Sequence, residues 1–112
     1  MNIYLDDERP CPAGWVAAKT APEAIALLKH NTVGQISLDH DLGEGNGNGN
    51  DVLLWIEEMV FTKGYRAPTI FVHSANSSAA AKMKAGILVI EREMAMQESE
   101  REMQTEMQGE SR

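Results

Sequence analysis

The fold of this chain is decided by the stretch Ser37-Leu38-Asp39-His40-Asp41-Leu42-Gly43, where a short apolar run ends in two carboxylates and an imidazole. The same pattern occurs twice more: Asp6 and Asp7 follow Ile3-Tyr4-Leu5, and His73-Ser74-Ala75-Asn76 follows Ile70-Phe71-Val72. The carboxyl ends of parallel strands meet at one edge of a sheet, where open α/β folds bind ligands. The sequence therefore predicts one polar site that is assembled from three strand ends.

The size and composition of the chain indicate a single acidic domain. Its 112 residues are enough for one domain and too few for two. The net charge is −7 at pH 7, which disfavours duplex DNA as a partner, because binding to a phosphate backbone relies on Lys and Arg. We expect residues 1–95 to form the α/β domain. Residues 96–112, rich in Glu, Gln and Met, are expected to form a polar tail that is helical or disordered.

The cysteine content and the apolar runs indicate a cytoplasmic protein. With Cys11 as its one cysteine, the chain forms no internal disulfide, which is typical of a reducing compartment. No signal-peptide pattern is visible, since the N-terminus enters a strand at once. The apolar runs are shorter than the roughly 20 residues that cross a bilayer. We therefore expect no membrane partner.

Strands and helices alternate along the sequence. The predicted strands are Asn2–Leu5, Trp15–Lys19 at the sheet edge, Gln35–Leu38 and Thr69–Val72. A first helix starts at the capping box formed by Thr20 and Glu23. A second helix is predicted over Asp51–Lys63, capped by Asn48 or Asn50 and ended by Gly64.

The apolar positions after Asn76 predict a third, long helix. Ala80, Met83, Ile87, Ile90 and Met94 recur at steps of three and four, which favours a helix from about Ser77 through about Met94. The competing interpretation is a fifth strand at Ile87–Ile90.

The Gly- and Asn-rich segment Gly43–Asn50 is predicted to be a mobile loop, because Gly and Asn tolerate positive φ. It is either a tolerated surface insertion or a lid over the site at Asp39–Asp41.

The order of these elements predicts a parallel α/β sandwich. Right-handed crossovers favour the strand order 2-1-3-4. The run Thr69–Val72 is continuously apolar, which is typical of a parallel strand that is covered on both faces. In this order the direction of the chain reverses between the strand of Asp6 and the strand of Asp39, which is the preferred ligand crevice of such folds.

Five stretches together resemble the cyclic-phosphate-processing receiver-like family, whose members are small relatives of response-regulator receiver domains. The stretches are Leu5-Asp6-Asp7-Glu8-Arg9-Pro10, Gly14-Trp15-Val16, Ser37–Gly43, Asp51-Val52-Leu53-Leu54-Trp55-Ile56-Glu57 and Val72-His73-Ser74-Ala75-Asn76. The resemblance covers residues 1 to about 94. It implies a flavodoxin- and receiver-like three-layer sandwich with a parallel sheet of about four strands, and an activity on cyclic phosphates.

A comparison with ordinary receivers separates matches from departures. Asp6, Asp7, Asp39 and Ser74 stand where a receiver has its acidic pair, its acceptor Asp and its Ser or Thr. A receiver also has a Lys after a fifth strand, whereas Ile87–Ile90 is followed here by Glu91-Arg92. His40, Asp41 and His73 are additions that a phosphorylation switch does not need. These departures count against a switch.

The strand-end residues predict metal-assisted chemistry on a phosphate. Asp6, Asp7, Asp39 and Asp41 are the expected metal ligands, and such an oxygen set suits Mg²⁺ or Mn²⁺. The expected catalytic residues are His40, His73 and Asp39, with the two imidazoles acting as base and acid. Arg9, Ser74 and Asn76 are the expected phosphate-binding residues.

Three hypotheses about function follow. The first is a metal-assisted phosphoesterase that acts on a small cyclic or nucleotide-type phosphate, or on an RNA end. The second is a signalling receiver that is phosphorylated on Asp39. The third is a non-catalytic interaction module, encoded by a phage or mobile element, that binds a protein partner or a second copy through its second helix and C-terminal helix.

Overall fold

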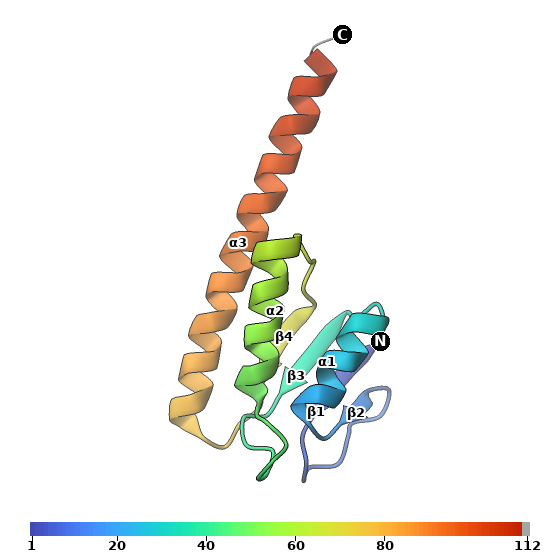
Figure 1. The fold of residues 1–112 in the computed structure, drawn as a ribbon, viewed down its shortest axis with the longest axis vertical. Coiled ribbons are helices and arrows are strands. Elements are labelled where there is room, and N and C mark those ends of the chain that lie inside the picture. Colours follow the sequence, from blue (N-terminus) through green and yellow to red (C-terminus); the bar gives the residue numbers. More distant parts are fainter. Residues whose placement is uncertain (111–112) are drawn as a thin grey trace.

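Four short strands form one parallel sheet, and they are joined by helices and one long loop. A computed structural model describes residues 1–110, with side chains to residue 106. The elements are β1 (Asn2–Leu5), β2 (Val16–Ala18), α1 (Ala21–His30), β3 (Gln35–Leu38), α2 (Gly49–Lys63), β4 (Thr69–Val72) and α3 (Ser77–Glu110), as Figure 1 shows. The strand order is β2-β1-β3-β4, and every neighbouring pair is parallel. The predicted receiver-like α/β fold and strand order are confirmed.

The helices lie on one face of the sheet. Figure 1 shows α1 and α2 in front of the strands and α3 beside α2, and α2 packs against both of the other helices. The handedness of the crossovers explains this: the connections through α1 and α2 both advance toward β4, so they cover the same face. The connection from β1 to β2 runs the other way, and it is a loop that contains Pro10 and Pro12.

The expected third layer is therefore not found in residues 1–110, which is a correction to the predicted sandwich. Among the crossovers, the β1–β2 connection is the one that would place a helix on the far side, and its prolines disfavour a helix there. We call the uncovered side the open face. Phe71 of β4 points to it and is 46% exposed, so β4 is not covered on both faces as its apolar run had suggested.

The core lies between the sheet and the helices. Strand residues alternate, so that every second side chain faces the helices. The side chains that are almost completely buried there are Ile3, Leu5, Ile36 and Leu38 of the sheet, Ala24 and Leu28 of α1, Val52, Leu53, Ile56 and Val60 of α2, and Met83 and Ile90 of α3. This packing fixes the helix starts beside the carboxyl ends of the strands.

The helix caps follow the sequence signals. Thr20 is the N-cap of α1, and its hydroxyl accepts a hydrogen bond from the backbone N–H of Glu23. The Glu23 carboxylate accepts from the N–H of Lys19 instead of Thr20, so the predicted capping box is only half formed. Asn48 is the N-cap of α2, where Asn48 and Asp51 form a complete capping box. Gly64 ends α2 in the left-handed conformation that glycine favours.

The Gly- and Asn-rich segment contacts its neighbours at two points. The backbone carbonyl of Asn46 accepts a hydrogen bond from the N–H of Ala21, which ties the loop to the start of α1. The Asn46 amide donates to the carbonyl of Leu42, and the Leu42 side chain is buried. These bonds tie the loop to the start of α1 and to Leu42, and the predicted mobility of the segment stays a prediction.

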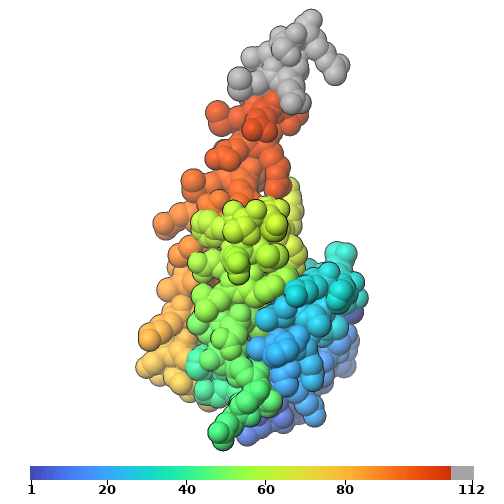
Figure 2. All heavy atoms as spheres, in the orientation of Figure 1, coloured from blue at the N-terminus to red at the C-terminus, as the bar shows by residue number. Residues whose placement is uncertain are grey.

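Helix α3 runs without interruption from Ser77 to Glu110. Ile87 and Ile90 are buried on one side of this helix, so the competing fifth strand is not present among the described residues. Figure 2 shows that the distal part of α3 extends beyond the body of the molecule. The division at residue 95 stays a prediction, and residues 111 and 112 lie outside the described part. Among the helices of residues 1–110, none has the length and apolarity needed to cross a bilayer.

Several apolar side chains on α2 and α3 are exposed. They are Leu54 and Phe61 of α2, and Leu88, Val89, Met96 and Met103 of α3. The interaction that was expected through these two helices stays a prediction.

Replacing Gly49 with Ala should destabilise the fold. A Cβ at Gly49 would lie 2.0 Å from the backbone oxygen of Asp39, because the start of α2 packs directly against the end of β3. We expect Gly49→Ala to lower the free energy of unfolding by at least about 2 kcal/mol, measured by urea denaturation. Gly34→Ala is the control, since its Cβ would meet only Asn2 Oδ1 at 3.5 Å. Equal stability of the two variants would contradict this contact.

Candidate functional site

Three carboxylates converge at the carboxyl end of the sheet. Asp6 and Asp7 follow β1 and Asp39 follows β3, and one oxygen from each lies within 4.8 Å of the others. The strands are neighbours, and their ladder continues past their ends, since the N–H of Asp39 donates to the Leu5 carbonyl at 3.0 Å. The expected metal ligands Asp6, Asp7 and Asp39 are thus brought together. A compact all-oxygen set fits a hard divalent cation such as Mg²⁺ or Mn²⁺.

The carboxylates of this cluster differ in their affinity for protons. Burial pushes the pKa of Asp6 upward, but the N–H groups of Arg9 and Glu8 and the His73 ring outweigh burial and hold this pKa below its ordinary value. The pKa of Asp39 is raised, first by burial and then by the negative charge of Asp6. Asp6 is therefore the fixed negative charge, and Asp39 is the carboxylate that gains most from a nearby cation.

Asp41 does not join this cluster. Its side chain is 68% exposed, and its Oδ1 lies 2.8 Å from Nδ1 of His40. The structure thus gives Asp41 a contact with an imidazole rather than with the other three carboxylates.

His73 lies on the open face, against Asp6. Its Nε2 is 3.0 Å from Asp6 Oδ2, and its Nδ1 is 2.6 Å from the hydroxyl of Ser37. The ring also stacks on Tyr4, with centroids 4.4 Å apart and planes 4° from parallel. Because an ionised carboxylate only accepts hydrogen bonds, Nε2 carries a proton. Both ring nitrogens of His73 are engaged, so this imidazole fixes the orientation of Asp6.

Sequence reasoning missed the contribution of Ser37. Its hydroxyl is buried in the middle of a strand, where neither its residue type nor its spacing from His73 attracts notice. The signal was its position two residues before Asp39, because alternate strand residues point to the same face.

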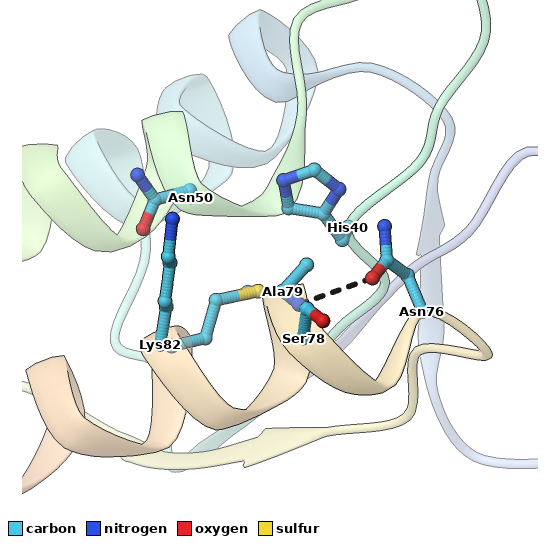
Figure 3. A pocket seen from close by; sticks show the side chains of 7 residues that line it. His40, Asn50, Asn76, Ser78, Ala79 and Lys82 are labelled. Atoms are coloured by element: carbon cyan, nitrogen blue, oxygen red, sulfur yellow. Dashed lines mark hydrogen bonds between the residues drawn. The ribbon is translucent and has the colours of Figure 1, made fainter.

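His40 lies in a different place from His73. It lines a hollow of about 360 Å³ between the starts of α2 and α3, together with Asn50, Asn76, Ser78, Ala79, Lys82 and Met83. Figure 3 shows that His40, Asn76 and Lys82 surround this hollow. The structure does not bring the two imidazoles into one cavity.

Lys82 is the second group that sequence reasoning missed. It lies on α3 four residues after Ser78, so both occupy the same face of the first turns of the helix. The hollow therefore combines an ammonium group and a helix N-terminus, which both favour an anion, with an imidazole.

The expected phosphate-binding residues are divided between two tasks. Ser74 and Asn76 cap the start of α3: the Ser74 hydroxyl accepts from the N–H of Asn76, and Asn76 Oδ1 accepts from the N–H of Ala79 at 3.1 Å. Asn76 also lines the hollow of His40. The Arg9 guanidinium donates to the carbonyl of His73 at 2.5 Å, and its Nε lies 4.0 Å from Asp6 Oδ2. Arg9 thus partly balances the charge of the cluster.

A comparison with known families gives a match over most of the chain. A family model described as the cyclic-phosphate processing receiver domain matches residues 1–88. The chain belongs to this family. The matched region of this cyclic-phosphate processing receiver domain contains the whole sheet, the carboxylate cluster and both hollow-lining helix starts. No curated protein and no solved structure gives a significant match.

In the absence of metal, Asp39→Asn should raise the free energy of unfolding. The same change should abolish the stabilisation that a bound metal ion gives. At neutral pH the change relieves repulsion from Asp6, while the new amide oxygen still accepts the bond from the N–H of His40. We expect a gain of about 1 kcal/mol, or roughly 4 °C in melting temperature, after solvent screening. Millimolar Mg²⁺ should raise the melting temperature of the parent protein only.

The pH dependence follows from the raised pKa of Asp39. The folded state holds this proton more tightly than the unfolded state, so stability falls as the pH rises from 3.8 to the folded pKa. The Asp39→Asn variant should lack this fall in stability.

For the Mg²⁺ experiment, Asp41→Asn is the control, and its melting temperature should respond to Mg²⁺ as that of the parent protein does. A Mg²⁺ response that survives Asp39→Asn would exclude Asp39 as a ligand.

Proposed function

We propose that this domain is a metal-assisted phosphoesterase that opens cyclic or nucleotide-type phosphates. The observation that carries the proposal is the convergence of Asp6, Asp7 and Asp39, whose oxygens lie within 4.8 Å of one another. Asp39 is also the neighbour of His40 in the sequence. Membership of the cyclic-phosphate processing family supports the same substrate class. His40 in turn lines a hollow that favours an anion.

Asp6, Asp7 and Asp39 would hold the divalent cation, Mg²⁺ or Mn²⁺. When bound, the cation neutralises charge on phosphoryl oxygens and lowers the pKa of coordinated water. The raised pKa of Asp39 supports this assignment, because a third carboxylate beside Asp6 needs a compensating positive charge.

His40 is the proposed proton-transfer group. The Asp41 carboxylate contacts Nδ1 at 2.8 Å, so it favours the tautomer in which Nδ1 carries the proton. Nε2 is then the nitrogen that exchanges a proton with a ligand in the hollow. Opening a cyclic ester forms a bond between a water oxygen and phosphorus and breaks one ring P–O bond. The attacking water gives up a proton, which Nε2 would accept, and the released alkoxide takes up a proton. An imidazole nitrogen can accept or donate a proton, so His40 suits this role.

His73 is proposed to act through Asp6. Its two nitrogens already bond to Asp6 and Ser37, so direct acid catalysis by His73 would require one of these bonds to break. The role that fits its contacts is to hold the Asp6 carboxylate in place for the cation. We therefore treat His73 as a positioning residue.

Positive and hydrogen-bonding groups surround the place where the phosphate would bind. Lys82, Ser78 and Asn76 lie on the side of the His40 hollow, and Arg9 lies beside Asp6. A phosphate between the two sides would receive charge from both. Ser74 supports this arrangement by bonding to the backbone of Asn76.

Turnover of nucleoside 2′,3′-cyclic phosphates in the presence of Mg²⁺ or Mn²⁺ tests the proposal. We expect Asp39→Asn and His40→Gln each to lower kcat by at least about 100-fold, since each removes a group that acts on the reacting phosphate. His30→Gln is the matched control, because His30 lies exposed at the end of α1. His73→Gln should weaken metal binding as well as turnover.

Two results would contradict the proposal. One is hydrolysis that Asp39→Asn leaves unchanged. The other is an acid-labile phosphoryl adduct on Asp39 after treatment with a small phosphodonor and Mg²⁺, which would favour a signalling receiver.

A further inference from the structure

The open face carries a second hollow, of about 310 Å³, that the proposed reaction does not use. It is lined by Tyr4, Pro12, Trp15, Gln35, Ser37 and Phe71. Tyr4 and Trp15 meet edge to face, with centroids 6.5 Å apart, and Phe71 is about half exposed beside them. Three of the six Trp, Tyr and Phe residues of the chain therefore gather on a sheet face that no helix of the described chain covers.

The rest of the open face is polar. The row of strand residues before Tyr4 consists of Asn2, Gln35 and Thr69, which are paired in register across β1, β3 and β4. A protein layer that packs on a sheet needs a continuous apolar surface. The open face offers only a local aromatic patch, which suits a small flat ligand better than a helix or a second copy of the chain.

The aromatic hollow lies next to the carboxylate cluster along the same strands. Tyr4, Ser37 and Phe71 are paired in register, and Asp6, Asp39 and His73 follow two residues later on the same three strands. Two residues of a strand span about 6.6 Å. The Tyr4 ring also stacks on His73, which contacts Asp6. A ligand that reaches from the hollow to the cluster needs a flat ring joined to a phosphate by a short linker.

We propose that this hollow binds the base of a nucleotide whose phosphate lies at the carboxylate cluster. The inference rests on the proposed function, because it assigns the substrate class of that site. Aromatic side chains stack on any base, and the Gln35 amide supplies both a donor and an acceptor for a base edge. The nucleotide is either free or the end of an RNA strand, since both present the same base, ribose and phosphate.

Tryptophan fluorescence tests the hollow directly. In a Trp55→Phe background, Trp15 is the one remaining tryptophan. We expect adenosine 3′-monophosphate with Mg²⁺ to quench its emission, and ribose 5-phosphate, which lacks a base, to bind at least about tenfold more weakly. Phe71→Ala should raise the Kd for the nucleotide about tenfold. Phe61→Ala is the matched control, because Phe61 is similarly exposed on α2.

Other results would overturn the inference. One is an equal affinity for adenosine 3′-monophosphate and ribose 5-phosphate. Another is a Kd for the nucleotide that Phe71→Ala leaves unchanged. The protein could instead form a dimer that shields Trp15 and that Phe71→Ala abolishes. In that case the hollow binds a second copy of the chain and not a nucleotide. A short RNA with a 3′-phosphate distinguishes the two sources: tighter binding than the mononucleotide indicates an RNA end, and equal binding indicates a free nucleotide.

The two proposals fail in different ways. Quenching by the nucleotide, together with hydrolysis that Asp39→Asn leaves unchanged, would keep the base-binding hollow and remove the proposed catalytic role. Ribose 2,3-cyclic phosphate tests the reverse case. If it is hydrolysed as fast as the nucleoside substrate, and Asp39→Asn is inactive, the reaction stands and the hollow is not its base site.

Discussion

The parallel pairing of β1 and β3 is the constraint on which the site depends. The hydrogen-bond ladder between these strands continues for one residue beyond Leu5 and Leu38, and it places Asp39 beside Asp6 and Asp7. Negative charges at this spacing repel one another, and the pKa of Asp39 is raised first by burial and then by the charge of Asp6. The packing of the core supplies the free energy that keeps them together.

Sequence patterns predicted the elements well because the signals were local. The strands at Gln35–Leu38 and Thr69–Val72, the Thr20 cap and the order of the strands all follow from short-range chemistry and from crossover handedness. The same handedness rule also implies a single layer for the crossover helices. Only the β1–β2 connection runs away from β4, and it is a loop that contains prolines. The contact of the loop at Asn46 with Ala21 joins residues far apart in the sequence, so no local signal reveals it.

The sequence predicted which residues lie near the site, but not which way their side chains point. Convergence of Asp6, Asp7 and Asp39 follows from strand ends alone. The side-chain partners of His40 and His73 do not, because residues next to a strand end can point to either side of the sheet edge. His73 pairs with Ser37 and Asp6 on one side, and His40 faces Lys82 and the helix starts on the other. The catalytic assignments therefore stay proposals.

Replacing a crossover helix by the loop between β1 and β2 changes how molecules approach the cluster. A sheet with helices on both sides admits a ligand only from above its edge. Here no helix of the described chain covers the flank beside Tyr4 and Trp15. The β1–β2 loop therefore leaves the cluster approachable from the open face as well as from above the edge of the sheet.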